Sequence, residues 1–139
     1  MVENWIVPCS VKFYDVVGHL NEKKSIVWRK VSALKEGDTV YLYIGAPYSE
    51  IKYRCRIVND DVDEQTLSEN SYAIKDTENK RKQKYLMLIL EYTYPDGVLS
   101  LEKLRANGLG QTQTQARTDR KLQVFIDSVN KELNVEPQG

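Results

Sequence analysis

Aromatic side chains in the first half of the sequence are the residues best suited to bind a ligand. Nine tyrosines and two tryptophans occur in the chain. Their flat apolar rings with a polar tip can fill a core or hold a flat ligand. Trp28 is the first candidate, because stacking on one indole face stabilises an unstacked nucleobase by about 1–3 kcal/mol. The alternative is a core residue packed against Val31 and Leu34.

Three tyrosines and a serine could complete a pocket around such a base. Tyr41 and Tyr43 share one face of a predicted strand, and Tyr43 is the candidate second wall; the alternative is the interior of the sheet. Tyr48 follows on a turn, where it could close the pocket mouth or stand exposed at a hairpin tip. Ser10 could offer its hydroxyl to a base edge, or cap the N-terminus of the next helix.

Basic side chains form groups that suit phosphate contact. Lys52, Arg54 and Arg56 alternate on one face of a predicted strand, which we expect to be solvated. Arg117 and Arg120 gather where the last predicted helix begins. An ordinary charged surface is the alternative for each. Because twenty basic and twenty acidic residues give a formal net charge of zero, only a local basic face could attract a nucleic acid.

Groups for catalysis are sparse. His19 is the only histidine in the sequence, and no acidic residue is placed to orient it. Cys9 and Cys55 fall on predicted strands and have neither metal-binding spacing nor a disulfide framework. The sequence also lacks a glycine-rich phosphate loop. We therefore expect no catalytic residue, no metal and no cofactor.

The elements that must position these side chains follow from hydrophobic periodicity. Alternating or continuous apolar runs predict strands over 4–7, 39–45, 51–58 and 85–94, the last apolar on both faces and therefore central. Helical spacing predicts helices over 10–20, 25–34 and 122–133, and a short strand or helix near 99–104. Within the polar stretch 59–83 we expect a helical turn near 64–68 and a mobile excursion near 76–83, which includes the basic cluster 80–82.

These elements predict an α+β fold, a curved sheet or barrel with helices on its outside. The length suits a single domain over residues 1–133, with 134–139 as a frayed tail or the start of a linker. The longest apolar run, 86–90, is far too short to span a membrane, and no signal-peptide pattern opens the chain. A cytoplasmic, non-membrane protein is therefore expected.

The order of several motifs resembles the EVE domain, a group within the PUA-like superfamily that is related to the YTH domain. The resemblance covers roughly residues 4–58. The motifs that carry it are, in order, Trp5-Ile6-Val7, Cys9-Ser10, Trp28, the Lys35-Glu36-Gly37-Asp38 turn, the Tyr41–Gly45 strand and the Tyr53–Val58 strand. Two departures stand out: Pro8-Cys9 replaces a lysine that often precedes the serine, and Ala46-Pro47-Tyr48 replaces a polar segment.

The resemblance implies a PUA-like β-barrel of about five to six strands with helices outside, including an amphipathic C-terminal helix. It implies a pocket that binds a modified or flipped-out base without catalysis. In that pocket Ser10 matches the family's serine, Trp28 its stacking tryptophan and Tyr43 its aromatic on the strand after the Gly-Asp turn.

The family also suggests partners. Bacterial EVE domains often look like specificity modules of restriction systems, fused to a nuclease or a nucleotide-driven motor, so DNA is favoured over RNA. Three alternatives stay open: an RNA-binding PUA-like domain, a protein-interaction module that uses the tyrosine face, and an enzyme that uses Ser10, Cys9 or His19.

Overall fold

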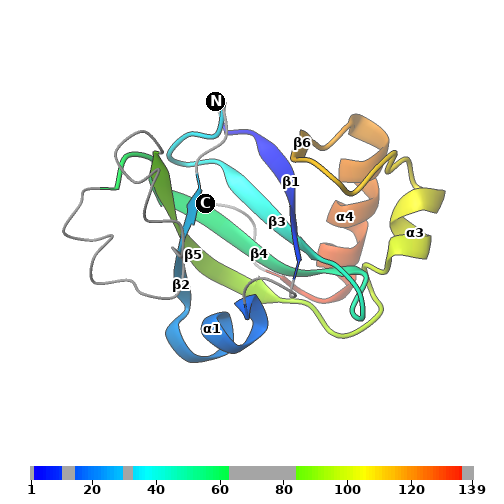
Figure 1. Cartoon of the computed structure of the whole chain (residues 1–139). Helices are drawn as coiled ribbons and strands as arrows, with labels where there is room; N and C mark the ends of the chain where they lie inside the picture. The colour runs from blue at the N-terminus through cyan, green and yellow to red at the C-terminus, as the bar shows by residue number, and fades with distance from the viewer. Residues whose placement is uncertain (1, 11–14, 30–32, 63–83, 136–139) are drawn as a thin grey trace.

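One mixed sheet of six strands organises the described chain, in the order β2-β5-β4-β3-β1-β6 (Figure 1). The computed structural model describes residues 2–10, 15–29, 33–62 and 84–135. The features predicted at 64–68, 76–83 and 80–82 lie outside these residues. The strands are β1 (Asn4–Cys9), β2 (Ser25–Arg29), β3 (Thr39–Ile44), β4 (Glu50–Asn59), β5 (Tyr85–Thr93) and β6 (Ala116–Arg117). The helices are α1 (Val16–Lys23), α3 (Leu101–Ala106) and α4 (Arg120–Glu132).

The centre of the sheet is an antiparallel meander of β3, β4 and β5. The predicted hairpin of residues 39–45 and 51–58 is confirmed, and β5 lies between β2 and β4, as its two apolar faces predict. β1 adds to β3 in parallel, and the two-residue β6 pairs antiparallel with β1. The expected α+β fold class is therefore confirmed.

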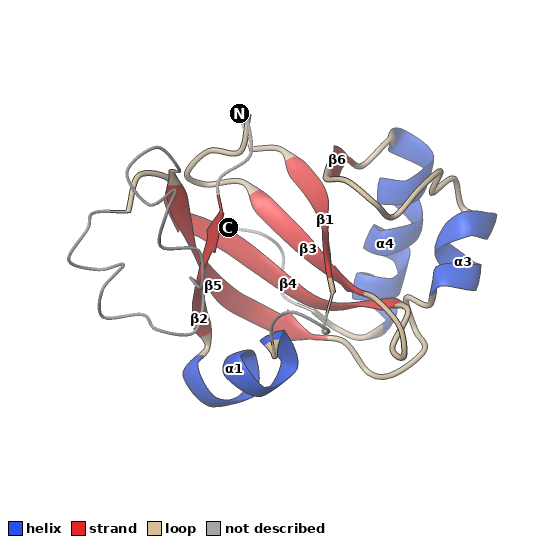
Figure 2. Ribbon diagram, viewed as in Figure 1, coloured by secondary structure: helices blue, strands red, loops and turns tan. Residues whose placement is uncertain are grey.

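Two core clusters cover opposite faces of this sheet, because successive strand residues point to opposite sides. The first, which we call the α1-side cluster, includes Trp5, Val7, Val40, Leu42, Ile44, Tyr53, Cys55, Leu86 and, from α1, Val16 and Leu20. The second, the α4-side cluster, includes Ile6, Tyr41, Tyr43, Ile51, Tyr94, Leu104 from α3, and Leu122, Ile126 and Val129 from α4. Figure 2 shows α3 and α4 on one side of the sheet and α1 apart from them.

The helix predicted from Ser25 onward is wrong, because residues 25–29 form strand β2. Its residues pair in register with β5, from Ser25 opposite Ile89 to Arg29 opposite Tyr85. Long-range pairing thus overrides a weak helical spacing, to which the β-branched Ile26 and Val27 were in any case poorly suited.

Helix α1 starts later than predicted, and Ser10 does not cap it. Asp15 is the N-cap, and its Oδ1 accepts a hydrogen bond from Gly18 N at 2.9 Å. A glycine fits this position because a Cβ at residue 18 would lie 2.3 Å from Asp15 Oδ2.

Helix α4 confirms the predicted apolar stripe. Asp119 caps it by accepting from Leu122 N at 2.8 Å, and the three α4 residues of the α4-side cluster face the sheet. No helix within the described residues is long and apolar enough to cross a membrane.

Candidate nucleic-acid interface

Trp28 lies at the penultimate position of β2, a terminal strand in the described sheet. Its backbone pairs with Leu86, and its half-buried ring packs against the α1-side cluster. This position is compatible with both interpretations of Trp28, as a core residue and as a ligand-binding residue. Part of the indole contributes to the core, and part stays open to a ligand.

Tyr41 and Tyr43 lie under α4. Both rings belong to the α4-side cluster, where Tyr43 is 4% exposed and Tyr41 is fully buried. Gln123 Nε2 of α4 donates to the Tyr41 hydroxyl at 3.3 Å, and burial raises the pKa of Tyr41. The pairing of Trp28 with Tyr43 as two walls of one pocket therefore needs correction. The two rings pack on opposite faces of the sheet, because the apolar stripe of α4 covers the tyrosine face.

Ser10 and Tyr48 are both exposed. Ser10 follows β1 directly, and Tyr48 occupies the turn between β3 and β4. The Lys52 ammonium lies 5.7 Å from the centroid of the Tyr48 ring and 3.0 Å from Asp96 Oδ1. The Asp96 side chain is 85% exposed, whereas that of Lys52 is 14% exposed, so the Lys52 ammonium is largely covered where it meets Asp96.

Arg54 and Arg56 differ sharply in exposure, although they share a face of β4. The Arg54 side chain is 5% exposed and its Nε lies 3.3 Å from Glu91 Oε1. The Arg56 side chain is 41% exposed, and its Nη1 lies 3.8 Å from Glu91 Oε2. The expectation of one solvated face is therefore wrong for Arg54, whose guanidinium is enclosed beside a carboxylate.

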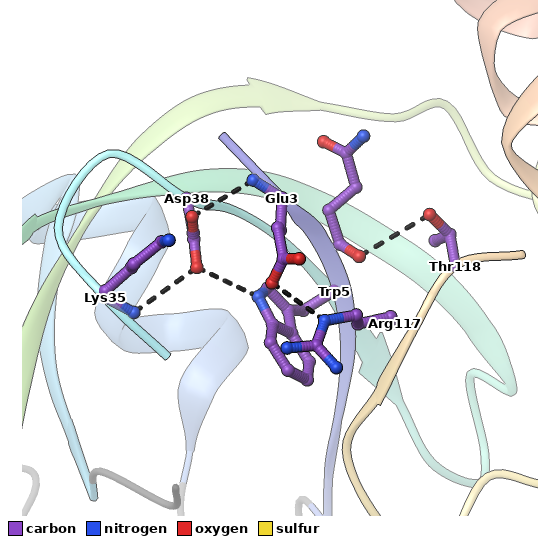
Figure 3. A network of polar contacts seen from close by, with 7 residues as sticks. Glu3, Trp5, Lys35, Asp38, Arg117 and Thr118 are labelled. Atoms are coloured by element: carbon purple, nitrogen blue, oxygen red, sulfur yellow. Dashed lines mark hydrogen bonds and ion pairs between the residues drawn. The ribbon is translucent and has the colours of Figure 1, made fainter. Parts of the chain in front are cut away.

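Arg117 of β6 is held at the edge of the sheet (Figure 3). Its Nε donates to Glu3 Oε2 at 2.8 Å, and its guanidinium carbon lies 4.5 Å from the centroid of the Trp5 ring. Carboxylate pairing combined with ring stacking fixes the orientation of this cation. It can still present its remaining N–H groups to a phosphate, since more than half of the side chain is exposed.

Asp38 organises the neighbourhood of Trp5 (Figure 3). Its completely buried carboxylate accepts hydrogen bonds from Trp5 Nε1 at 3.0 Å, Glu3 N at 3.1 Å and Lys35 N at 3.3 Å. Three donors on one carboxylate fix the start of β1 against the turn before β3. This network explains the Gly-Asp turn, which sequence reasoning treated only as a family motif.

Exposed cations and apolar groups meet where α4 begins, at what we call the basic surface. Arg120 borders two hollows there. One, of about 220 Å³, is lined also by Arg117, Thr118, Gln123 and Asn4 and by two carboxylates, that of Glu3, which pairs with Arg117, and that of Asp119, which caps α4. The other, of about 640 Å³, is lined also by Lys121, Val124 and Phe125. We define the basic surface by Arg117, Thr118, Arg120, Lys121, Gln123, Val124 and Phe125.

Sequence reasoning singled out Arg117 and Arg120 of the basic surface as phosphate contacts and did not single out Val124. Val124 is 60% exposed, which is unusual for a valine on an otherwise polar helix face. Its position just off the buried stripe of α4 was the available signal, because an apolar residue there has no core to fill.

Of the groups considered for catalysis, His19 and Cys55 are buried and Cys9 is partly buried, whereas Ser10 is exposed. Burial raises the pKa of the Cys9 thiol to about 12 and also raises the pKa of Cys55. Both thiols are therefore protonated at neutral pH and poor nucleophiles. His19 is buried, with its Nε2 2.6 Å from the Ser25 carbonyl oxygen. Among the residues that the structure describes, no group of three or more His, Cys, Asp or Glu side chains could hold a metal ion.

Known structures share this fold, although no family model and no curated protein matches the sequence. A hypothetical protein from Leishmania major superposes with a TM-score of 0.65 and 18% identity, over 96% of this chain and 98% of that one. The S128A mutant of ZmASCH from Zymomonas mobilis gives 0.63 and 14%, over 91% and 96%. A protein from Pseudomonas putida gives 0.63 and 17%, over 91% and 98%. The chain therefore shares its fold with these structures, which include an ASCH protein.

Proposed function

We propose that this chain is a non-catalytic nucleic-acid-binding module whose basic surface contacts backbone phosphates. The observation that carries the proposal is the meeting of exposed Arg117, Arg120 and Lys121 around two hollows that share Arg120. Phosphate contacts supply most of the affinity in sequence-independent binding. A local group of cations is the arrangement that a chain of zero net charge needs for this role.

The state of these cations supports the proposal. Among the described residues, no carboxylate forms an ion pair with Arg120 or Lys121, whereas Arg117 is oriented by Glu3. The neighbouring Asp119 is occupied as the cap of α4, and Asp127 accepts from Gln123 at 2.8 Å. The basic surface therefore offers two available charges and one oriented guanidinium to an anion.

Apolar groups beside the cations suit the rest of a nucleotide. Val124 is exposed, and the half-buried Phe125 lines the same hollow as Lys121. Bases and sugars can pack on such groups without sequence preference. A plain charged surface would lack them.

The finer form of the proposal is a reader of a modified or flipped-out base, with DNA favoured by the resemblance to EVE domains. In it Trp28 stacks on the base and Ser10 supplies a polar contact. Base extrusion costs a few kcal/mol, which a neutral domain with one local basic surface offsets poorly. Such a reader would therefore serve as the specificity module of an attached or neighbouring nuclease or motor.

The double change Arg120→Gln and Lys121→Gln tests the basic surface. Each lost phosphate contact lowers the slope of log affinity against log salt by about 0.7–0.9, so we expect the slope to fall by about 1.5. Fluorescence anisotropy with labelled single- and double-stranded oligonucleotides at several salt concentrations measures it. Lys23→Gln with Lys131→Gln is the matched control, because it removes the same charge from exposed positions elsewhere. Equal slopes for the two double variants would contradict the proposal.

Trp28→Ala tests the base contact separately. We expect oligonucleotides that carry modified cytosines or adenines to quench the fluorescence of the wild type more strongly than that of the variant. The remaining Trp5 is nearly buried and gives the background signal. Loss of one stacking face lowers affinity by about 5- to 150-fold. Unchanged affinity would exclude Trp28 as the base contact and leave the phosphate contacts untouched.

A further inference from the structure

A cleft of about 530 Å³ opens where β3 begins and β4 ends, at residues distinct from those of the basic surface. We call it the Glu91 cleft. It is lined by Val2, Glu36, Gly37, Thr39, Arg56, Ile57, Val58 and Glu91. Its volume lies within the range of about 300–1,000 Å³ that is typical of small-molecule sites. Gly37 leaves it open on one side, since a Cβ there would meet no atom within 4 Å.

A β-bulge places Glu91 in this cleft. Arg54 pairs with Tyr92 and Cys55 with Leu90, so Glu91 is the extra residue of β5. A bulge puts two residues of one strand opposite a single residue of the other and redirects a side chain. Here it brings the Glu91 carboxylate to the two arginine side chains of β4.

The carboxylate is poorly satisfied by the protein. Glu91 Oε1 is buried, lies 3.3 Å from Arg54 Nε and makes no hydrogen bond within the described part of the chain, and Oε2 lies 3.8 Å from Arg56 Nη1. A carboxylate has about four acceptor positions, and buried polar groups are normally paired. The Glu91 cleft therefore presents an acceptor, Oε2, directly beside a half-exposed donor, Arg56.

The balance of charge favours a neutral ligand. Two carboxylates, Glu36 and Glu91, line the cleft with Arg56, and Arg54 lies behind Glu91. Two negative and two positive groups attract neither an anion nor a cation strongly. A group that is both donor and acceptor can pair with Glu91 and Arg56 together.

We infer that the Glu91 cleft binds a neutral planar ligand with a lactam edge, an N–H beside a carbonyl oxygen, as in hypoxanthine and guanine. The ligand N–H donates to Glu91 Oε2. The carbonyl oxygen, which has two lone pairs, accepts from the Arg56 guanidinium. An amidine edge, as in adenine, offers only one ring-nitrogen lone pair to Arg56 and fits less well. This inference does not depend on the proposed nucleic-acid binding.

Inosine and 1-methylinosine test the lactam edge, because they differ by one methyl group that removes the N–H donor. Isothermal titration calorimetry should show inosine binding, with 1-methylinosine about tenfold weaker or worse, because Glu91 is then left facing a methyl group. Adenosine should also bind more weakly. Equal affinities for inosine and 1-methylinosine, or tighter binding of adenosine, would overturn the inference.

Variants assign the binding to the cleft. Arg56→Gln changes a partly exposed side chain and should lower inosine affinity about tenfold. Arg105→Gln, at an exposed position of α3 that does not line the cleft, is the matched control and should leave the inosine affinity unchanged. Amide NMR shifts on adding inosine should concentrate at Gly37, Thr39 and Val58. Shifts confined to other segments, or equal effects of the two variants, would contradict the assignment. Oligonucleotide binding by the Arg56→Gln variant tests the basic surface independently, because Arg56 is not one of the residues that define that surface.

Discussion

Replacing Glu91 by alanine should lower the free energy of unfolding by about 3–5 kcal/mol, because it leaves the Arg54 guanidinium buried without its carboxylate. The pair sits between β4 and β5, where Arg54 is almost fully enclosed. Urea denaturation followed by circular dichroism measures the loss. Glu36→Ala, also in the Glu91 cleft but on the exposed turn, should stay within about 0.5 kcal/mol of the wild type.

A double variant distinguishes the effect of breaking the Arg54–Glu91 ion pair from the effect of changed packing around the bulge. Arg54→Met with Glu91→Leu removes both charges and keeps similar volumes, so it should lose much less stability than Glu91→Ala alone. If the double variant is as unstable as the single one, an unpaired charge is not the cause. Packing around the bulge would then explain the loss.

Replacing Asp38 by alanine is the second change with a large expected effect, a loss of about 3 kcal/mol or more. Three donors, from Trp5, Glu3 and Lys35, would lose their shared acceptor, and each buried unsatisfied donor costs about 1–3 kcal/mol. Near-ultraviolet circular dichroism should also report a freer Trp5 ring, since its indole N–H would no longer be anchored.

Asp60→Ala is the matched control for Asp38→Ala. Asp60 accepts one hydrogen bond, from Glu36 N at 2.9 Å, on the exposed side of the same turn. Its loss should cost less than about 1 kcal/mol, because water replaces the carboxylate. Similar thermal melting midpoints for both variants would contradict the claim that Asp38 organises this region.

Much of the fold could be predicted from periodicity, because two strong patterns dominate the sequence. Residues 39–44 alternate between two different sets of apolar side chains, and 122–129 repeat at helical spacing. In the folded chain, the apolar residues of each pattern are buried. Residues 25–29 were misassigned because their short apolar run fits either period, and only pairing with β5 decides between them.

The site could be predicted less well, because it depends on which element covers which face. The sequence shows that Tyr41 and Tyr43 share a face, but not that α4 lies over it. The alternation of Lys52, Arg54 and Arg56 likewise does not reveal that the middle residue is enclosed. The bulge at Glu91 is a mismatch of register between two strands, so neither strand shows it alone.

The α4-side cluster links distant parts of the chain, and this has a consequence during synthesis on the ribosome. Gln123 and Tyr41, which it brings together, are separated by 82 positions. Until α4 emerges, the strands made first hold Ile6, Tyr41 and Tyr43 on a face with no cover. A nascent chain at that stage would be a substrate for chaperones that recognise apolar surface, and stalling before Arg120 should trap it there.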